Sequence, residues 1–265
     1  MAKASPPSQL AALERLRRPA GTPPLVLGHR GARHAAPENT HAAFELSRNE
    51  GAAGVELDVR LAKTGEIVVL HDVTLERVTG GADRRALEQL SWHEARLIDV
   101  GRGERVPLLS DVLDWARNHD QLVNVEVKAD VRRRRELVRG VVRLLARHPW
   151  GPEGVVISSF DPRFVWALAR ALPNIPSAFL FHTKSPMARA AAMVGAATFT
   201  RMGARAVHPE HVLVTPQRMH AWRSKQALVG VWTVNDDNRA RDLAKLGVDY
   251  IVSDRPGAIL QSLRA

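Results

Sequence analysis

Two pairs of charged residues in this chain are spaced two positions apart within short apolar runs. The first pair is Glu56 and Asp58, and the second is Glu126 and Lys128. Side chains alternate between faces along a β-strand, so residues two positions apart point to the same side. A strand rarely aims two charges at one side of an apolar stretch unless a ligand or ion requires them there. The spacing therefore predicts a charged functional site.

Three of these side chains are carboxylates, and their chemistry indicates a metal site. The expected ligands are Glu56, Asp58 and Glu126. Carboxylate oxygens are the ligands that Mg²⁺ and Ca²⁺ prefer, with water in the remaining positions. Three ligands leave room for a substrate oxygen, such as one from a phosphate group. The sequence thus predicts one divalent cation, Mg²⁺ or Ca²⁺, and the ligand types do not separate the two.

Two histidines accompany the charged pairs at the ends of apolar runs. His29 is followed by Arg30, and His71 is followed by Asp72. Histidine titrates near neutral pH, so one ring can act as general base and the other as general acid. Asp72 would orient or charge-balance His71. Arg30 and Lys128 would add positive charge around a phosphate.

Short strand-like runs alternate with amphipathic segments from residue 25 onward. Eight strand–helix units in a chain of 265 residues predict an α/β protein of the (β/α)8 TIM-barrel type, with a doubly wound open sheet as the alternative. In such barrels the active site lies where the strands end. The expected strands are 25–29, 54–60, 122–128, 154–159, 177–181, 204–208, 228–234 and 249–253. The expected helices are 40–50, 110–119, 133–147, 161–171, 187–202, 215–225, 237–246 and 256–263, with caps at Asn39 or Thr40, Ser110, Asp161, Thr215 and Asp236.

The alternation divides the chain into two parts. Residues 1–23 form an N-terminal extension in which 10–16 favour a short helix, and residues 24–265 form the barrel domain. Within the barrel, residues 61–107 are expected to be an inserted hairpin and loop after the second strand. The hairpin returns through 67–70, and the rest of the insertion is expected to be irregular because glycines recur in it.

Composition restricts the function classes. The chain has no cysteine, which excludes disulfides, thiolate metal sites and cysteine nucleophiles. The net charge of +10 favours anionic partners. Only 5% of residues are aromatic, so platforms for stacking bases are scarce and no nucleic acid is expected as a partner. The absence of a long apolar segment leads us to expect a cytoplasmic protein.

The ordered set of motifs resembles the glycerophosphodiester phosphodiesterase family. The resemblance extends over roughly residues 25–257, and the insertion lies where that family has one. The motifs are Gly28-His29-Arg30-Gly31, Ala36-Pro37-Glu38-Asn39-Thr40, Glu56-Leu57-Asp58, His71-Asp72, Val125-Glu126-Val127-Lys128, Ser159-Phe160, Val231-Trp232-Thr233-Val234-Asn235 and Ser253-Asp254-Arg255-Pro256.

The resemblance implies a TIM barrel that hydrolyses glycerophosphodiesters to glycerol 3-phosphate and an alcohol. It implies that a hydroxyl of the substrate attacks phosphorus to give a cyclic phosphate, which water then opens. It leaves open which histidine is the acid. The implied roles are metal ligation by Glu56, Asp58 and Glu126, acid–base catalysis by His29 and His71, and phosphate contacts from Arg30 and Lys128.

Two neighbouring residues have alternative interpretations. Trp232 is expected to form a wall against the glycerol or alcohol group, or else to belong to the core. Glu38 either adjoins a helix cap or hydrogen-bonds within the active site.

Two other functions fit the sequence less well. A lysophospholipase D-like enzyme would act on a lipid phosphodiester, and the basic surface and the segment 10–18 favour a weak contact with a membrane surface. A non-catalytic barrel that binds phosphorylated ligands or nucleic acid would not need two histidines and three carboxylates. The expected partner is a small glycerophosphodiester, and the sequence leaves the oligomeric state open.

Overall fold

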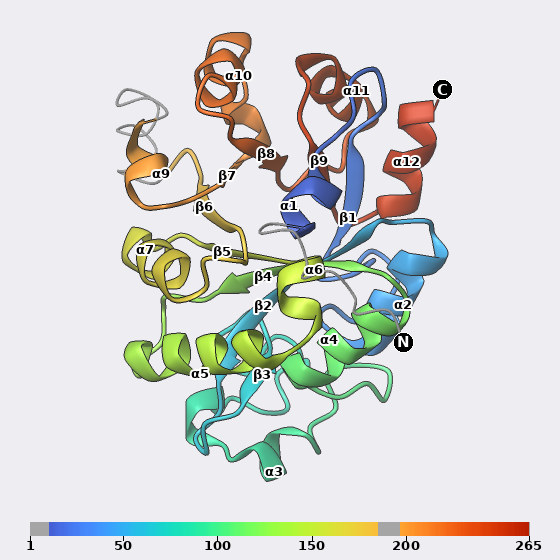
Figure 1. Ribbon diagram of the computed structural model, residues 1–265. Coiled ribbons are helices and arrows are strands. Elements are labelled where there is room, and N and C mark those ends of the chain that lie inside the picture. Colours follow the sequence, from blue (N-terminus) through green and yellow to red (C-terminus); the bar gives the residue numbers. More distant parts are fainter. Residues whose placement is uncertain (1–10, 185–196, 265) are drawn as a thin grey trace, which may run out of the picture.

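The computed structural model describes residues 11–184 and 197–264 of the chain, and these form a closed barrel. Strand β1 pairs in parallel with both β2 and β9, so the sheet closes on itself. Eight strands run in parallel, and β3 alone is antiparallel, added to the outside of β2 (Figure 1). The predicted TIM barrel is confirmed. The strands are β1 Leu25–His29, β2 Gly54–Leu61, β3 Ile67–Val69, β4 Leu122–Val127, β5 Val155–Ser159, β6 Ser177–Phe181, β7 Ala206–Pro209, β8 Leu228–Val231 and β9 Tyr250–Ser253.

Helices surround this barrel and cover the outer face of the sheet (Figure 1). Their apolar stripes face the strands, as in α2, whose Ala43 and Phe44 are buried. The predicted helix 187–202 lies partly outside the described residues. The helices are α1 Ala11–Leu16, α2 His41–Asn49, α3 Trp92–Ala95, α4 Leu109–Asn118, α5 Arg134–Arg147, α6 Trp150–Gly154, α7 Pro162–Ala171, α9 Ala197–Arg201, α10 Pro216–Arg223, α11 Asp237–Leu246 and α12 Pro256–Arg264, with 3₁₀ turns η1 Leu87–Gln89 and η2 His211–Leu213.

Most of the expected helix caps are present. A side-chain oxygen accepts a hydrogen bond from a first-turn backbone N–H at Thr40, Asp161, Thr215 and Asp236. The cap predicted at Ser110 is wrong. Helix α4 begins one residue earlier, because Leu109 is buried in the core and the Leu108 carbonyl already accepts from Val112.

Two strand and loop predictions also need correction. The strand expected over 228–234 ends at Val231, and an isolated bridge between Glu210 and Trp232 follows it. The stretch 72–107 is less irregular than expected, since it contains η1 and α3.

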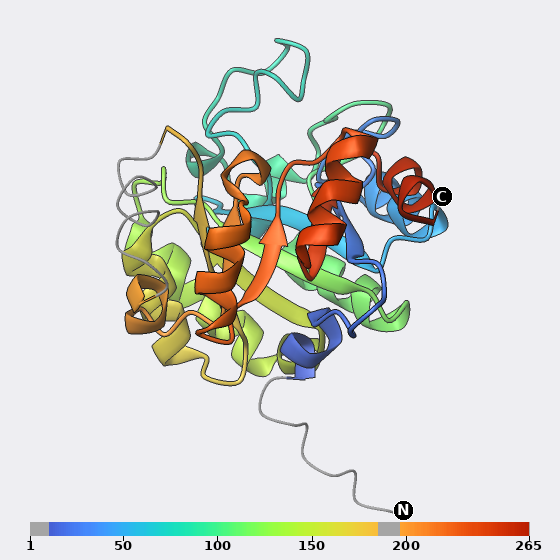
Figure 2. The same cartoon turned by 90° about the horizontal axis from the view of Figure 1, so that it is seen from above.

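The segment after β2 has a small apolar cluster of its own. Ser91 and Glu94 form a reciprocal capping box at the start of α3, which fixes the direction of that short helix. Figure 2 shows this segment above the ends of the strands. The buried cluster comprises Ala62, Val68, Leu70, Leu75, Leu87, Leu90, Ala95, Val100 and Val106.

Helix α1 lies at the opposite end of the barrel. Leu16 is fully buried among the residues that begin the strands, including Leu122 and Leu228. Arg15 donates to the Asp120 carboxylate at 2.9 Å and fastens the helix to the loop before β4. Figure 2 shows α1 below the strands, so the base of the barrel is covered. Among the helices of the described residues, none has the length and apolar character needed to span a membrane.

Candidate active site

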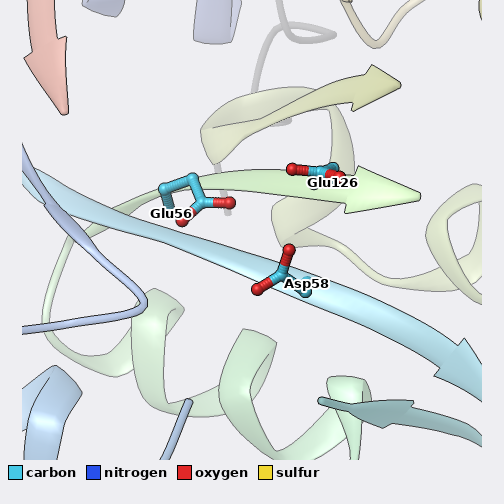
Figure 3. Close-up of side chains that lie close together, drawn as sticks. All are labelled: Glu56, Asp58 and Glu126. Carbon is cyan, nitrogen blue, oxygen red and sulfur yellow. The ribbon is translucent and has the colours of Figure 1, made fainter. Parts of the chain in front are cut away.

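Three carboxylates from two neighbouring strands converge at the carboxyl end of the barrel. The parallel register of β2 and β4 places Asp58 directly beside Glu126. Glu56 lies one step earlier on the same side of β2. One oxygen from each side chain can be chosen so that all three lie within 4.8 Å of one another (Figure 3). All three residues are buried, so their charges depend on partners within the protein.

The electrostatics of this cluster fit a bound cation. Burial raises the pKa of Glu56, and repulsion from Asp58 and Glu126 raises it further. Burial also raises the pKa of Glu126, although Lys128 opposes that shift. Asp58 differs because Lys128 and Arg30 outweigh its burial and hold its pKa below the usual range. Three hard oxygen donors, two of which have raised pKa values, are suited to a divalent cation of the Mg²⁺ or Ca²⁺ type.

Two cationic side chains border the carboxylates. Lys128 donates to Glu126 Oε1 at 2.8 Å and to Asp58 Oδ1 at 3.3 Å. The backbone N–H of Arg30 donates to Glu56 Oε2 at 3.1 Å. The side-chain Nε of Arg30 lies 3.2 Å from Asp58 Oδ2 without hydrogen-bond geometry. The side chains of Lys128 and Arg30 therefore lie where a phosphate bound at the carboxylate cluster would contact them.

Each of the two predicted catalytic histidines is paired with an aspartate. His29 Nδ1 lies 2.6 Å from Asp254 Oδ1, and His71 Nδ1 lies 2.6 Å from Asp72 Oδ1. When Nδ1–H donates to a carboxylate, Nε2 is left as the proton acceptor. His29 Nε2 is 3.9 Å from Glu56 Oε2, next to the carboxylate cluster. Burial lowers the pKa of His71, against the attraction of Asp58.

Several residues that support the site were not identified from the sequence. Asp254 and its partner Asn235 lie within motifs that resemble the family, but no role was deduced for them. Arg60 continues the two-residue alternation of β2 and is 2% exposed. It donates to the His71 carbonyl at 2.8 Å and to Asp130 Oδ2 at 2.8 Å. The alternation of charges along β2 was the signal that could have revealed Arg60.

The two residues before the N-cap of α2 also face the site. Asn39 donates to Asp58 Oδ2 at 3.0 Å from a backbone with a φ of 58°. It is therefore not the helix cap, and Thr40 has that role. Glu38 accepts from Arg30 at 2.8 Å, which favours the active-site interpretation of Glu38 over the cap interpretation.

An aromatic group lies across the mouth from the charged residues. The rings of Phe160 and Trp232 meet edge to face at 5.4 Å, and the ring of His182 is 5.4 Å from that of Phe160. Trp232 Nε1 donates to the His208 carbonyl at 2.7 Å, which fixes the indole. One small cavity connects the two sides, and it is lined by His29, Glu56, Asn124, Glu126, Leu180, His208, Gly230, Trp232 and Val252.

Comparison with known proteins identifies the family. Residues 29–258 match the glycerophosphoryl diester phosphodiesterase family. The chain belongs to this family. A glycerophosphodiester phosphodiesterase of Caldanaerobacter subterraneus subsp. tengcongensis is 29% identical over 247 residues, which cover 91% of this chain and 98% of the relative.

Solved structures agree with this membership of the phosphodiesterase family. A structure from Silicibacter pomeroyi has a TM-score of 0.83 and 26% identity, covering 96% of this chain and 97% of its own. A phosphodiesterase of Oleispira antarctica, in complex with the product sn-glycerol-3-phosphate, has a TM-score of 0.81 and 23% identity, covering 91% of this chain and 97% of its own. The second likeness shows the shared barrel fold.

Proposed function

We propose that this chain hydrolyses glycerophosphodiesters to glycerol 3-phosphate and an alcohol, with a divalent cation and two histidines. One observation carries the proposal. Two histidines, each with Nδ1 paired to an aspartate, accompany a buried cluster of three carboxylates in a member of a phosphodiesterase family. This combination provides charge stabilisation and proton transfer at one place.

The charged residues divide into two tasks in this proposal. Glu56, Asp58 and Glu126 hold the cation, Mg²⁺ or Ca²⁺. When bound, the cation polarises the phosphoryl oxygens and stabilises the negative charge that develops on them. Arg30 and Lys128 bind the remaining phosphate oxygens, and their positive charge acts most strongly because the site is largely withdrawn from water.

The two histidines move protons. One ring removes the proton from a glycerol hydroxyl next to the phosphate, and the oxygen of that hydroxyl forms a bond to phosphorus. The bond between phosphorus and the oxygen of the leaving alcohol breaks, and the second histidine ring donates a proton to this oxygen. Water then opens the cyclic phosphate, with the proton roles reversed. The near-equivalent pairing of His29 with Asp254 and of His71 with Asp72 leaves both assignments of acid and base open.

The substrate is proposed from the glycerophosphate half. The Oleispira antarctica phosphodiesterase binds sn-glycerol-3-phosphate on the same fold, which supports a glycerophosphate here. Trp232, fixed by its bond to the His208 carbonyl, offers a flat apolar wall to the carbon atoms of the glycerol or the alcohol.

The test is release of glycerol 3-phosphate from glycerophosphocholine and glycerophosphoethanolamine, with Mg²⁺, Ca²⁺ or EDTA. We expect EDTA to abolish activity, and His29→Ala and His71→Ala to lower kcat about 10²–10⁴-fold. The matched control is His220→Ala, because His220 is an exposed histidine on α10. Activity that survives EDTA or His29→Ala contradicts the mechanism. Preference for lysophosphatidylcholine would favour the lysophospholipase D-like alternative.

A further inference from the structure

We infer that Arg77, on the segment that follows β3, is a positioning residue for His71. The inference rests on the proposed function, because His71 acts in catalysis only if the chain is a phosphodiesterase. Arg77 touches neither the carboxylate cluster nor the histidines directly. Its guanidinium instead joins two acidic residues, Glu38 and Asp72, that approach the site from different loops.

The contact with Asp72 determines how the His71 ring is held. Asp72 Oδ1 lies 2.6 Å from His71 Nδ1, and Asp72 Oδ2 accepts a hydrogen bond from Arg77 Nε at 2.6 Å. Both oxygens are thus engaged, and the plane of the carboxylate is fixed. Asp72 has no other ionic partner among residues 11–184 and 197–264. Without Arg77, a carboxylate that is already a quarter exposed is free to rotate toward water.

The contact with Glu38 anchors the guanidinium. Arg77 Nη2 donates to Glu38 Oε1 at 2.6 Å and Nη1 donates to Oε2 at 3.0 Å, which is a bidentate pair. The side chain of Glu38 is only 10% exposed, and it also accepts from Arg30. A continuous path of contacts therefore runs from Arg30 through Glu38, Arg77 and Asp72 to His71.

The other histidine has an equivalent support. Asp254 holds His29 Nδ1 on Oδ1, and its Oδ2 accepts from Asn235 Nδ2 at 2.7 Å. Each histidine therefore has an aspartate, and each aspartate has a fixed N–H donor. Asn235 belongs to the barrel itself, whereas Arg77 belongs to the segment above it. The orientation of His71 thus depends on where that segment sits.

Further contacts hold the same segment against α2 and the loop before it. Arg102 donates to the Ala35 carbonyl, and Glu104 accepts from the Ala42 backbone N–H at 3.4 Å. These contacts do not reach either histidine. Arg77, by contrast, links the docked segment to Asp72 and through it to His71.

The experiment compares Arg77→Ala with Arg85→Ala in the full chain. Arg85 lies on the same segment, is similarly exposed (53% against 48%) and pairs with its own carboxylate, Asp83, at 2.7 Å. We expect Arg77→Ala to lower kcat about 10–100-fold, with KM for glycerophosphocholine changed less than about threefold. Arg30 keeps Glu38 and Asp58 as partners, so phosphate binding is largely retained.

Two further variants separate positioning from folding. Asp72→Asn and the double variant with Arg77→Ala should lower kcat by nearly the same factor, since both break the same support. Arg77→Lys should recover part of kcat because it keeps the positive charge. The recovery should be incomplete because an ammonium cannot bind both carboxylates in one plane. If Arg77→Ala does not fold, the kcat values of Arg77→Lys and Asp72→Asn test the positioning role of Arg77 instead.

The outcomes distinguish this inference from the proposed function. An inactive wild-type chain overturns both. An active wild type in which Arg77→Ala equals Arg85→Ala overturns only the inference. Fully additive losses for Arg77→Ala and Asp72→Asn also overturn it, because the two residues would then act independently.

Discussion

His29 and Asp254 lie 225 positions apart in the chain, yet Nδ1 and Oδ1 of these residues are 2.6 Å apart. His29 ends β1, and Asp254 directly follows β9. These are the two strands that meet where the barrel closes, with Gly28 aligned to Ser253. Closing the barrel therefore assembles this pair, and a barrel that failed to close at this seam would lack it.

Replacing Asp254 with asparagine tests that pair. We expect Asp254→Asn to lower kcat about 10–100-fold, because an amide does not select the tautomer that leaves His29 Nε2 free. The steady-state rate of glycerol 3-phosphate release measures the effect. Asp114→Asn is the control, since Asp114 contacts His148 at 3.2 Å away from the site. Equal rates for the two variants would contradict a role for Asp254.

Binding of Mg²⁺ or Ca²⁺ should stabilise the folded protein. At a free metal concentration 100-fold above the Kd, the expected gain in unfolding free energy is about 2.7 kcal/mol. Thermal unfolding with and without metal measures this gain. The double variant Glu56→Gln and Glu126→Gln should lose it, while its metal-free form should be more stable than the metal-free wild type because repulsion is relieved.

Surface carboxylates give the control for the metal prediction. Glu94→Gln with Glu136→Gln removes the same charge from exposed positions and should leave the metal effect intact. A metal effect that persists without Glu56 and Glu126 would place the cation elsewhere.

His208 should make stability depend on pH. Burial lowers the pKa of His208 to about 3, and Nε2 of its ring is hydrogen-bonded to the Tyr250 hydroxyl. Below about pH 6.5 the unfolded chain binds a proton that the folded chain does not. The unfolding free energy contributed by His208 should fall by about 1.6 kcal/mol from pH 6.5 to pH 5, and should continue to fall toward pH 3.

Urea unfolding of wild type and His208→Gln at these two pH values measures that contribution. The variant has no imidazole to titrate, so its free energy should change less than that of the wild type. Parallel curves would mean that His208 is not held neutral in the folded protein.

Gly230 should tolerate no side chain. A Cβ at this position would lie 2.2 Å from Tyr250 Cζ and 2.3 Å from Cε2, inside the barrel. We expect Gly230→Ala to lower the unfolding free energy by about 1–3 kcal/mol through overpacking. In a Tyr250→Ala background the same change should cost much less. Equal costs in both backgrounds, measured by urea unfolding, would show that the ring is not the obstacle.

The barrel and its charged end could be predicted because they are written in local patterns. Apolar runs with two-residue alternation identify Glu56 and Asp58 on β2, and the parallel register then brings Glu126 beside Asp58. Most of the side chains predicted for the site lie at the carboxyl ends of strands or just beyond them, whereas Glu56 and Asp58 lie within β2.

The supports of the site could not be predicted because they depend on long-range contacts. Asp254 reaches His29 only through barrel closure, and Arg77 reaches Glu38 only when the inserted segment docks. Neither contact leaves a periodic signal in the sequence. The false cap at Ser110 shows a related limit, since burial of Leu109 outweighed the preference of serine for helix starts.

Helix α1 covers the end of the barrel opposite the carboxylate cluster. Within residues 11–184 and 197–264, Leu16 of this helix packs among the first residues of the strands and fills that end of the barrel. Substrate and products of the proposed reaction would therefore pass the other end of the barrel, where His29, His71 and Trp232 lie. Glycerol 3-phosphate formed in the proposed reaction would occupy the same site as the diester, and we expect it to act as a competitive inhibitor in steady-state assays.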